Sequence, residues 1–421
     1  MCGINDSQRV VVTGTGVVSS VGNDVVSFWD SLLAGRSGLG PVTSFDASPM
    51  KTRIAGEIKN FDISKFMEVK EARRFDPFCH YAIAAGDEAL AQAGIKPAEM
   101  SDEARERVGV MVGSGIGGIR TLEEQARTMV GRGPSRSSPL MVPMMIIDMA
   151  AGALSIRYGF KGPNMGMVTA CASGSHAIGE AYWIIRRGDA DIMLTGGAEA
   201  CISMLGMTGF CAMRAMSERN DDPTRASRPF DKERDGFVMA EGAGILVLES
   251  LAHAKARGAN ILAEIIGYGA SGDANHITAP APNGTGAAQA IRCAIQRAGI
   301  SSDEVDYINA HGTSTPLNDK LETMAFKSVF GEHARKVAIS STKSMTGHAL
   351  GAAGGLESVV CIKSLQTGII APTINLDNPD PECDLDYTPH KPKERQVKIA
   401  LNTNLGFGGH NVALLFKKWE G

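Results

Sequence analysis

Hydrophobic residues in this chain gather in short continuous runs rather than in alternating patterns. The runs are rich in Val, Ile and Leu, and glycine or polar residues bound each of them. Such runs are typical of strands that are covered on both faces of a sheet. The strands predicted on this basis are Arg9–Thr13, Val108–Val112, Asp191–Leu194, Gly244–Leu248, Val397–Asn402 and Asn411–Phe416.

Longer segments between these runs have the spacing of helices. We predict helices over Cys79–Ala93, Ala287–Ala298 and Lys320–Phe330. Strands that alternate with helices along the chain indicate an α/β protein. At 421 residues the chain is long enough for two or three domains.

Two segments of the chain resemble each other. At an offset of 172 residues, Cys171 falls on Lys343 and His176 falls on His348. Each segment follows an apolar run and opens a helix of small residues, and an internal repeat of this kind constrains the whole architecture. Chance similarity between two helices rich in Gly and Ala is the alternative. The two related halves predicted here are residues 9–259 and residues 260–418.

Charge and hydropathy limit the classes of function. The chain has 42 basic and 46 acidic residues and a net charge of −4, whereas proteins that bind nucleic acid or anionic membranes carry a basic excess. The sequence has no run of 18 apolar residues, and its N-terminus lacks the apolar centre of a signal peptide. We therefore expect a cytoplasmic protein whose partners include neither nucleic acid nor a membrane.

The eight cysteines are scattered singly, without a CxxC pair or a Cys/His cluster at zinc spacing. We expect free thiols in a reducing compartment, and neither a metal nor a cofactor. Cys171 differs from the others because it lies at a predicted strand-to-helix turn, where free N–H groups lower the pKa of a thiol. A catalytic nucleophile and a buried structural cysteine both fit this context.

Three further motifs carry polar groups that can serve chemistry. His311 follows the apolar run Val305–Ile308, and ligands bind at such strand ends in α/β sheets. Lys343 and His348 share a Ser/Thr/Gly-rich segment before an almost uncharged helix. Near the C-terminus, the backbone of the glycine-rich segment Gly406–Gly409 can donate N–H groups to an oxyanion. A core histidine, a solvated lysine and a tight turn are the structural alternatives.

Together these motifs are similar to those of one known family. Over residues 9–418 the chain resembles the elongating β-ketoacyl-acyl carrier protein synthases of fatty acid synthesis. The motifs that carry the resemblance are Thr169-Ala-Cys-Ala-Ser-Gly174, Ala226-Ser-Arg-Pro-Phe-Asp231, Arg234-Asp-Gly-Phe237, His311-Gly-Thr-Ser-Thr-Pro316, Lys343-Ser-Met-Thr-Gly-His348 and Gly406-Phe-Gly-Gly409. The resemblance implies the thiolase-like fold, a five-layered αβαβα arrangement of two duplicated halves.

The resemblance also implies a reaction and a set of catalytic residues. Cys171 would take an acyl chain from an acyl carrier protein, and malonyl carrier protein would lose CO₂ and attack that thioester. His311 and His348 would donate hydrogen bonds to the enolate oxygen. Lys343, linked to Glu357, would organise the charge of the site. Phe407 would gate the pocket, and its N–H group would join that of Cys171 as the oxyanion hole.

Substrate and partner positions follow from the same resemblance. Ile116 and Phe210 match positions that line the acyl pocket, and the family forms homodimers. The positions that would face the pantetheine arm are Thr278, Thr313 and Thr315. The positions that would form a basic docking surface for the acidic carrier protein are Lys70, Arg73, Arg74, Arg136 and Arg214.

Four other classes of protein compete with this interpretation. A thiolase uses a second cysteine near the C-terminal glycine turn, and Gly406–Asn411 contains none. A non-catalytic chain-length partner lacks the nucleophile, whereas Cys171 is present. A papain-like protease has no use for the Lys343-to-His348 motif. A polyketide ketosynthase is not separated from a fatty acid enzyme by these residues.

Overall fold

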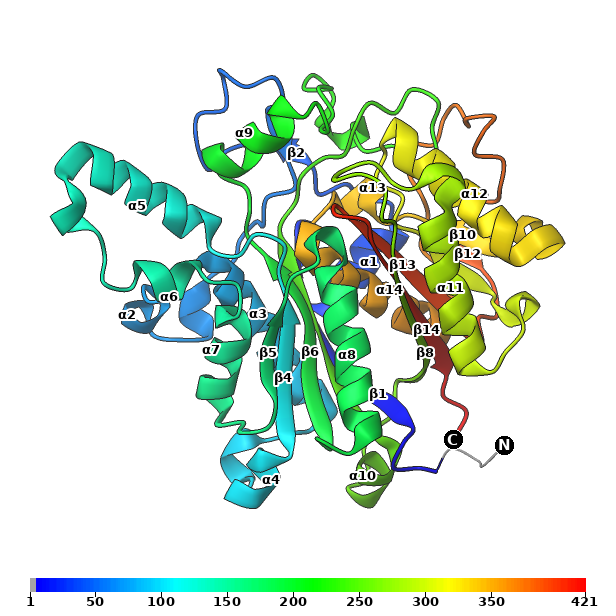
Figure 1. Cartoon of the computed structure of the whole chain (residues 1–421), viewed down its shortest axis with the longest axis horizontal. Helices are drawn as coiled ribbons and strands as arrows, with labels where there is room; N and C mark the ends of the chain where they lie inside the picture. Colours follow the sequence, from blue (N-terminus) through cyan, green and yellow to red (C-terminus); the bar gives the residue numbers. More distant parts are fainter. Residues whose placement is uncertain (1–4) are drawn as a thin grey trace.

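The computed structural model describes residues 5–421, and its centre is a mixed β-sheet (Figure 1). The strands of this sheet are β1 (Val10–Ser19), β4 (Val108–Gly113), β5 (Asn164–Met167), β6 (Ile192–Glu199), β7 (Gly242–Ser250), β8 (Ala263–Gly272), β9 (Tyr307–Asn309), β10 (Ala338–Ser340), β13 (Ile399–Gly406) and β14 (His410–Lys418). Within the described residues they are joined in the order β10-β9-β13-β14-β8-β1-β7-β6-β4-β5. Each strand predicted from an apolar run overlaps one of them.

The two halves of the sheet have the same strand order. When the strands of each half are counted along the chain, the order from the edge to the middle is third, second, fourth, fifth and first. The strands β5, β4, β6, β7 and β1 run inward from one edge, and β10, β9, β13, β14 and β8 occupy the matching places on the other side. The first set lies N-terminal to residue 251 and the second set lies C-terminal to residue 262. The predicted boundary at residue 259/260 falls between β7 and β8, and the division of the chain into two domains stays a prediction.

Helices form three layers around the two halves of the sheet (Figure 1). On the first half, α3 (Pro77–Ala93) and α7 (Met149–Tyr158) cover the outer face; on the second half α11 (Thr285–Ala298) does so, with α12 (Pro316–Phe330) packed beside it. Between them, α8 (Ser173–Arg187) and α14 (Ala353–Thr367) contact strands of both halves. The halves therefore face each other across α8 and α14. The five layers αβαβα of the thiolase-like fold are confirmed.

Both faces of the strands are buried, which explains the continuous apolar runs in the sequence. In β7, Leu246 and Leu248 lie in the central core around α8 and α14, whereas Ile245 and Val247 lie in the core beneath α3. Successive side chains of a strand point to opposite faces, so a strand between two cores needs apolar residues at every position. The strands β14 and β4 follow the same rule.

The offset predicted for the internal repeat is wrong. In the first half the 3-10 turn η4 (Ala170–Ala172) leads into α8, and in the second half η9 (Leu350–Ala352) leads into α14. These pairs lie 180 residues apart, not 172, so Cys171 corresponds to Gly351. The two histidines that suggested the shorter offset are not equivalent, because one lies inside α8 and the other precedes η9.

Further elements complete the fold outside these layers or, as with the buried helix α13, between them. The additional helices are α1 (Val25–Leu33), α2 (Val69–Ala72), α4 (Asp102–Glu106), α5 (Ile119–Arg132), α6 (Met141–Met145), α9 (Met204–Ala212), α10 (Leu251–Ala256) and α13 (Lys343–Thr346). Two small sheets pair β2 (Gly40–Pro41) with β3 (Ile54–Ala55) and β11 (Ile369–Ile370) with β12 (Lys393–Glu394). The helix α5 projects from the body of the molecule (Figure 1). Within residues 5–421 we find no helix both long and apolar enough to cross a bilayer.

Candidate active site

The turn between β5 and α8 carries Cys171. Its neighbour Ala170 has a φ of +51°, a left-handed conformation that residues other than glycine rarely adopt and that often marks a functional turn. Cys171 is 8% exposed, and it lines a pocket of about 330 Å³. The thiol is therefore enclosed by protein but faces a space that a substrate can enter.

Two imidazoles from the second half line the same pocket. His311 follows β9, and His348 lies between α13 and η9. Their rings meet edge to face, with centroids 5.2 Å apart and planes at 85°. The fold thus brings one thiol from the first half beside two imidazoles from the second.

Behind these residues lies a buried ion pair. Lys343 opens α13 and is 1% exposed, and its ammonium contacts the carboxylate of Glu357 on α14. The other oxygen of that carboxylate accepts a hydrogen bond of 2.6 Å from Asn404 Nδ2. Lys343 does not line the pocket in the described structure, but its charge acts on Cys171 and on both imidazoles.

The glycine-rich segment between β13 and β14 closes over the nucleophile. A Cβ atom on Gly406 would lie 2.5 Å from the backbone oxygen of Thr169, so only glycine permits this approach. The N–H group of the next residue, Phe407, and the N–H group of Cys171 itself lie near enough to the thiol to lower its pKa. The ring of Phe407 packs against Phe210, at 6.2 Å between centroids.

Burial controls the protonation of the site. It raises the pKa of the Cys171 thiol to about 12, although the Lys343 charge and the two N–H groups oppose the shift. Burial, with the Lys343 charge second, also holds the pKa of His311 and of His348 well below the ordinary value. Both imidazoles are therefore neutral at pH 7. The N–H groups at this turn lower the pKa of Cys171, as predicted, but burial outweighs them and the net shift is upward.

A carboxylate that the sequence analysis missed supports the first imidazole. Glu322 of α12 accepts hydrogen bonds from the backbone N–H groups of His311, at 2.7 Å, and of Gly312, at 2.8 Å. It also accepts one from the hydroxyl group of Thr403, at 2.9 Å. Burial raises its pKa to about 7. The sequence shows an acidic residue within a helix, but it does not show that this face of the helix is buried.

A second missed carboxylate joins the two halves. Glu199, at the end of β6, accepts N–H bonds from Gly115 at 2.7 Å and from Ile116 at 3.2 Å. It also accepts the N–H of Gly351, at 2.9 Å, from the turn that follows His348. One buried carboxylate thus holds the loop of Ile116 against the segment that carries the second imidazole.

The remaining predicted residues divide into three groups. Ile116 packs against the apolar cluster that contains Cys171. The predicted residues that line the pocket are Phe210, Arg214, Thr278, Thr313 and Thr315. The exposed residues that lie outside the pocket lining are Lys70, Arg73, Arg74 and Arg136. Among the described residues, we find no group of three His, Cys, Asp or Glu that is arranged to hold a metal ion.

Comparison with known families decides what kind of protein carries this site. Residues 7–254 match the family model described as Beta-ketoacyl synthase, N-terminal domain, and residues 262–377 match the model of its C-terminal domain. The chain belongs to the beta-ketoacyl synthase family. Together the two matches cover the nucleophile turn, both imidazoles and the buried ion pair.

Members of the beta-ketoacyl synthase family match the chain over nearly its whole length. A curated 3-oxoacyl-[acyl-carrier-protein] synthase 2 from Synechocystis sp. is 51% identical over 415 residues, which is 99% of each chain. The protein of the same name from Staphylococcus aureus is 51% identical over 417 residues, covering 99% of this chain and all of the relative.

Solved structures of the family share the fold. A type II polyketide synthase acyl-carrier protein in complex with its ketosynthase contains a chain that superposes with a TM-score of 0.90 at 35% identity, covering 98% of this chain and 99% of that one. A beta-ketoacyl synthase from Burkholderia phymatum superposes with a TM-score of 0.89 at 35% identity, covering 98% and 100%.

The raised thiol pKa predicts how Cys171 responds to pH. Because the pKa of about 12 lies above the working range, the thiolate fraction should rise about tenfold per pH unit between about pH 6 and about pH 9. Alkylation of the Cys171 peptide by iodoacetamide, followed by mass spectrometry, should rise in the same proportion. A rate that levels off near neutral pH would show instead that the N–H groups and Lys343 outweigh burial.

Proposed function

We propose that this chain is a 3-oxoacyl-[acyl-carrier-protein] synthase that extends fatty acyl chains by decarboxylative Claisen condensation. The observation that carries the proposal is that one pocket holds the thiol of Cys171 beside the neutral imidazoles of His311 and His348. The relatives that bear this name, at 51% identity over nearly the full length, support the choice of substrate.

In the first step of the proposed reaction, the sulfur of Cys171 attacks the thioester carbonyl of an acyl carrier protein. The bond from the carbonyl carbon to the pantetheine sulfur breaks, and the released pantetheine thiol takes up the proton that Cys171 loses. In the tetrahedral intermediate of this step, the former carbonyl oxygen bears a negative charge. The N–H groups of Cys171 and Phe407, which both lie near the thiol, can donate to that oxygen.

In the second step, malonyl carrier protein loses CO₂ and the electron pair moves onto its thioester oxygen. The enolate carbon then attacks the Cys171 thioester, a carbon–carbon bond forms, and the Cys171 sulfur leaves and regains a proton. His311 and His348 can each donate an N–H bond to the enolate oxygen. Because both imidazoles are neutral, they can stabilise the enolate by hydrogen bonds without protonating its carbon.

The buried ion pair sets the electrostatic background of this chemistry. Lys343 places a positive charge near Cys171 and both imidazoles, which favours the anions that form in each step. Glu357 compensates that charge, so that the lysine is not buried alone. We propose that burial, reinforced by the Lys343 charge, keeps the imidazoles neutral, and that the same charge stabilises the transient negative charge on the substrates.

The pocket offers separate regions for the two ends of the substrate. We propose that Thr278, Thr313 and Thr315, which line the pocket, face the polar pantetheine arm. We propose that the acyl chain occupies the apolar side, where Ile116 and Phe210 pack against the cluster around Cys171. The Phe407 ring against Phe210 would then separate the two regions.

Exposed basic residues support docking of the acidic carrier protein. Lys70, Arg73 and Arg74 lie on or next to α2, and Arg136 lies near the end of the projecting α5 segment. Arg214 is exposed at the pocket itself. One structural neighbour is an acyl-carrier protein in complex with its ketosynthase, which supports a carrier protein as the partner here. Rim charges of this kind mainly steer the encounter.

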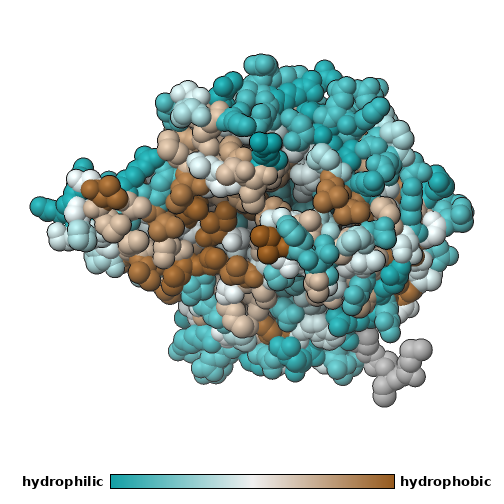
Figure 2. All heavy atoms as spheres, turned by 45° about the horizontal axis from the view of Figure 1, so that its top comes forward, coloured by the Kyte–Doolittle hydropathy of each residue, from teal (hydrophilic) through white to brown (hydrophobic). Residues whose placement is uncertain are grey.

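We also propose that the enzyme works as a homodimer. Figure 2 shows apolar side chains gathered on one face of the molecule, on the side where α5 projects in Figure 1. The exposed apolar residues between residues 129 and 168 are Met129, Val130, Leu140, Val142, Ile146, Ile156, Met165 and Val168. The strand β5 forms an edge of the sheet beside them and can pair with a second copy. The cytoplasmic location stays a prediction.

Removal of the nucleophile should abolish condensation. The Cys171→Ala variant should form no 3-oxoacyl product from acyl and malonyl carrier proteins, while its thermal unfolding stays close to that of the wild type, because a small thiol is lost.

His311→Ala should reduce CO₂ release from malonyl carrier protein by about a hundredfold or more, and acyl loading of Cys171 by much less. Condensation by the alanine variant of Cys171 would refute the nucleophile, and equal loss of both steps in His311→Ala would refute the separate role of the imidazole.

A charge on the apolar face should dissociate the dimer. Val130 is 84% exposed, and Val26 on α1 is 67% exposed but does not belong to the set of residues between 129 and 168. Val130→Asp should shift the mass in solution from twice the 44.3 kDa chain toward one copy, whereas Val26→Asp should not. Light scattering after size exclusion measures both. A single copy in the wild type, or an equal effect of the two variants, would contradict the proposed interface.

A further inference from the structure

The loop of residues 311–316, here called the His–Thr loop, carries four pocket residues on a backbone that needs support. These residues are His311, Thr313, Thr315 and Pro316. Between them, Gly312 has a φ of +35° and Ser314 a φ of +67°, both in the left-handed region. Because such a backbone is strained at a residue other than glycine, the surrounding structure must hold the loop in place.

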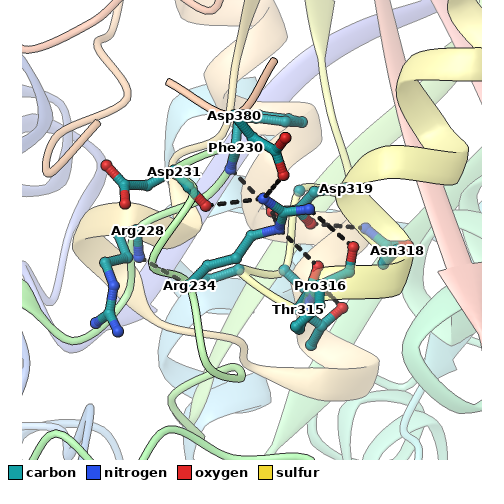
Figure 3. A network of polar contacts seen from close by, with 12 residues as sticks. Arg228, Phe230, Asp231, Arg234, Thr315, Pro316, Asn318, Asp319 and Asp380 are labelled. Atoms are coloured by element: carbon teal, nitrogen blue, oxygen red, sulfur yellow. Dashed lines mark hydrogen bonds and ion pairs between the residues drawn. The ribbon is translucent and has the colours of Figure 1, made fainter. Parts of the chain in front are cut away.

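One buried guanidinium holds the far end of this loop (Figure 3). The Nε atom of Arg234 donates to the backbone oxygen of Thr315 at 3.0 Å, and Nη2 donates to that of Pro316 at 2.8 Å. Its Nη1 atom donates to the Asp231 oxygen at 2.8 Å and to Asp380 Oδ2 at 2.6 Å. The side chain of Arg234 is only 4% exposed. Each of the three guanidinium nitrogens therefore donates at least one hydrogen bond.

A buried carboxylate completes the clamp. Asp319 is 0% exposed, and its Oδ2 lies 3.6 Å from Arg234 Nε. The same oxygen accepts the N–H of Phe230 at 2.9 Å, and the backbone N–H of Thr313 lies close enough to the carboxylate to lower its pKa. The His–Thr loop is thus fixed at Thr313 through Asp319 and at Thr315 through Arg234. Both contacts are made by the backbone of the two threonines that line the pocket.

We propose that Arg234 is a positioning residue that sets Thr313 and Thr315 for binding of the pantetheine arm. This inference rests on the proposed function of the two threonines. Their hydroxyl oxygens lie 3.0 Å apart, so a small shift of the backbone beneath Thr315 changes both. Even a small displacement of a binding loop weakens the interaction with substrate, although no contact residue is lost.

A second buried arginine provides a matched control. The side chain of Arg228 is 8% exposed, and it donates to the backbone oxygens of Glu233 and Ala226 and to the Asp235 carboxylate. Its guanidinium makes no hydrogen bond to the His–Thr loop in the described structure. Arg228 contacts this loop through its backbone N–H, which donates to Ser314 Oγ at 3.0 Å and which a change of the side chain retains. Loss of Arg228 therefore damages the same surrounding loop without removing the clamp.

The test compares three variants of the full-length enzyme, Arg234→Met, Arg234→Lys and Arg228→Met. Steady-state condensation gives kcat and KM for malonyl carrier protein. Alkylation of Cys171 by iodoacetamide, which needs no pantetheine arm, reports whether the nucleophile is intact. Hydrogen exchange of a peptide that contains residues 311–316 reports whether the loop is held.

For Arg234→Met we expect KM to rise about tenfold or more, kcat to change by less than about threefold, and Cys171 alkylation to stay unchanged. Exchange of the His–Thr loop should be faster. Arg234→Lys keeps the buried charge for folding, but one ammonium does not reach both carbonyls, so KM should rise by an intermediate factor. Arg228→Met should leave KM within about twofold of the wild type.

Several results would overturn the proposal. An unchanged KM in a folded Arg234→Lys or Arg234→Met variant removes the positioning role. An equal rise of KM in Arg228→Met shows general damage instead of a clamp, and so does slower alkylation of Cys171 in the Arg234 variants. Failure of the proposed function is distinguishable, because the wild type itself would then release no CO₂ and form no 3-oxoacyl product.

Discussion

The close approach of the two halves at the start of α8 and α14 is the constraint on which the rest of the structure depends. A Cβ atom on Gly174, in the first turn of α8, would lie 2.8 Å from the backbone oxygen of Gly351. Only small residues let the turn of the nucleophile and the turn after His348 meet so closely. Glu199 fixes this contact by bonding to Gly351 from the first half. Without that approach, the thiol and the imidazoles would not share a pocket.

Burial then determines the electrostatics that the pocket offers. It keeps the imidazoles neutral, raises the pKa of the thiol, and forces each buried charge to find a partner, as in the pair of Lys343 and Glu357. In the same buried surroundings, three other charged side chains hold the backbone beneath the pocket residues by hydrogen bonds. They are Glu322, Asp319 and Arg234. Two kinds of buried charge thus serve the site. In the proposed reaction, one acts on the substrates through its electrostatic field, and the other acts by holding a loop in position.

Much of this arrangement was predictable from the sequence, because strands covered on both faces leave continuous apolar runs. The nucleophile turn, the two imidazole motifs and the glycine-rich turn were also visible, since each follows or precedes such a run. The register of the repeat was not predicted correctly from the sequence. The predicted match of Cys171 with Lys343 rested on residue similarity, whereas in the fold Cys171 corresponds to Gly351. Glu199 and Glu322 escaped notice because burial of a carboxylate depends on distant segments that only the folded chain brings together.

The most direct measurement is to locate the acyl group on the enzyme during the reaction. Incubation with acyl carrier protein alone, followed by digestion and mass spectrometry, should place the acyl mass on the peptide that contains Cys171. Addition of malonyl carrier protein should then remove that mass and release one CO₂ for each group removed. An acyl group on any other residue, or condensation that proceeds while the acyl group stays on Cys171, would contradict the account.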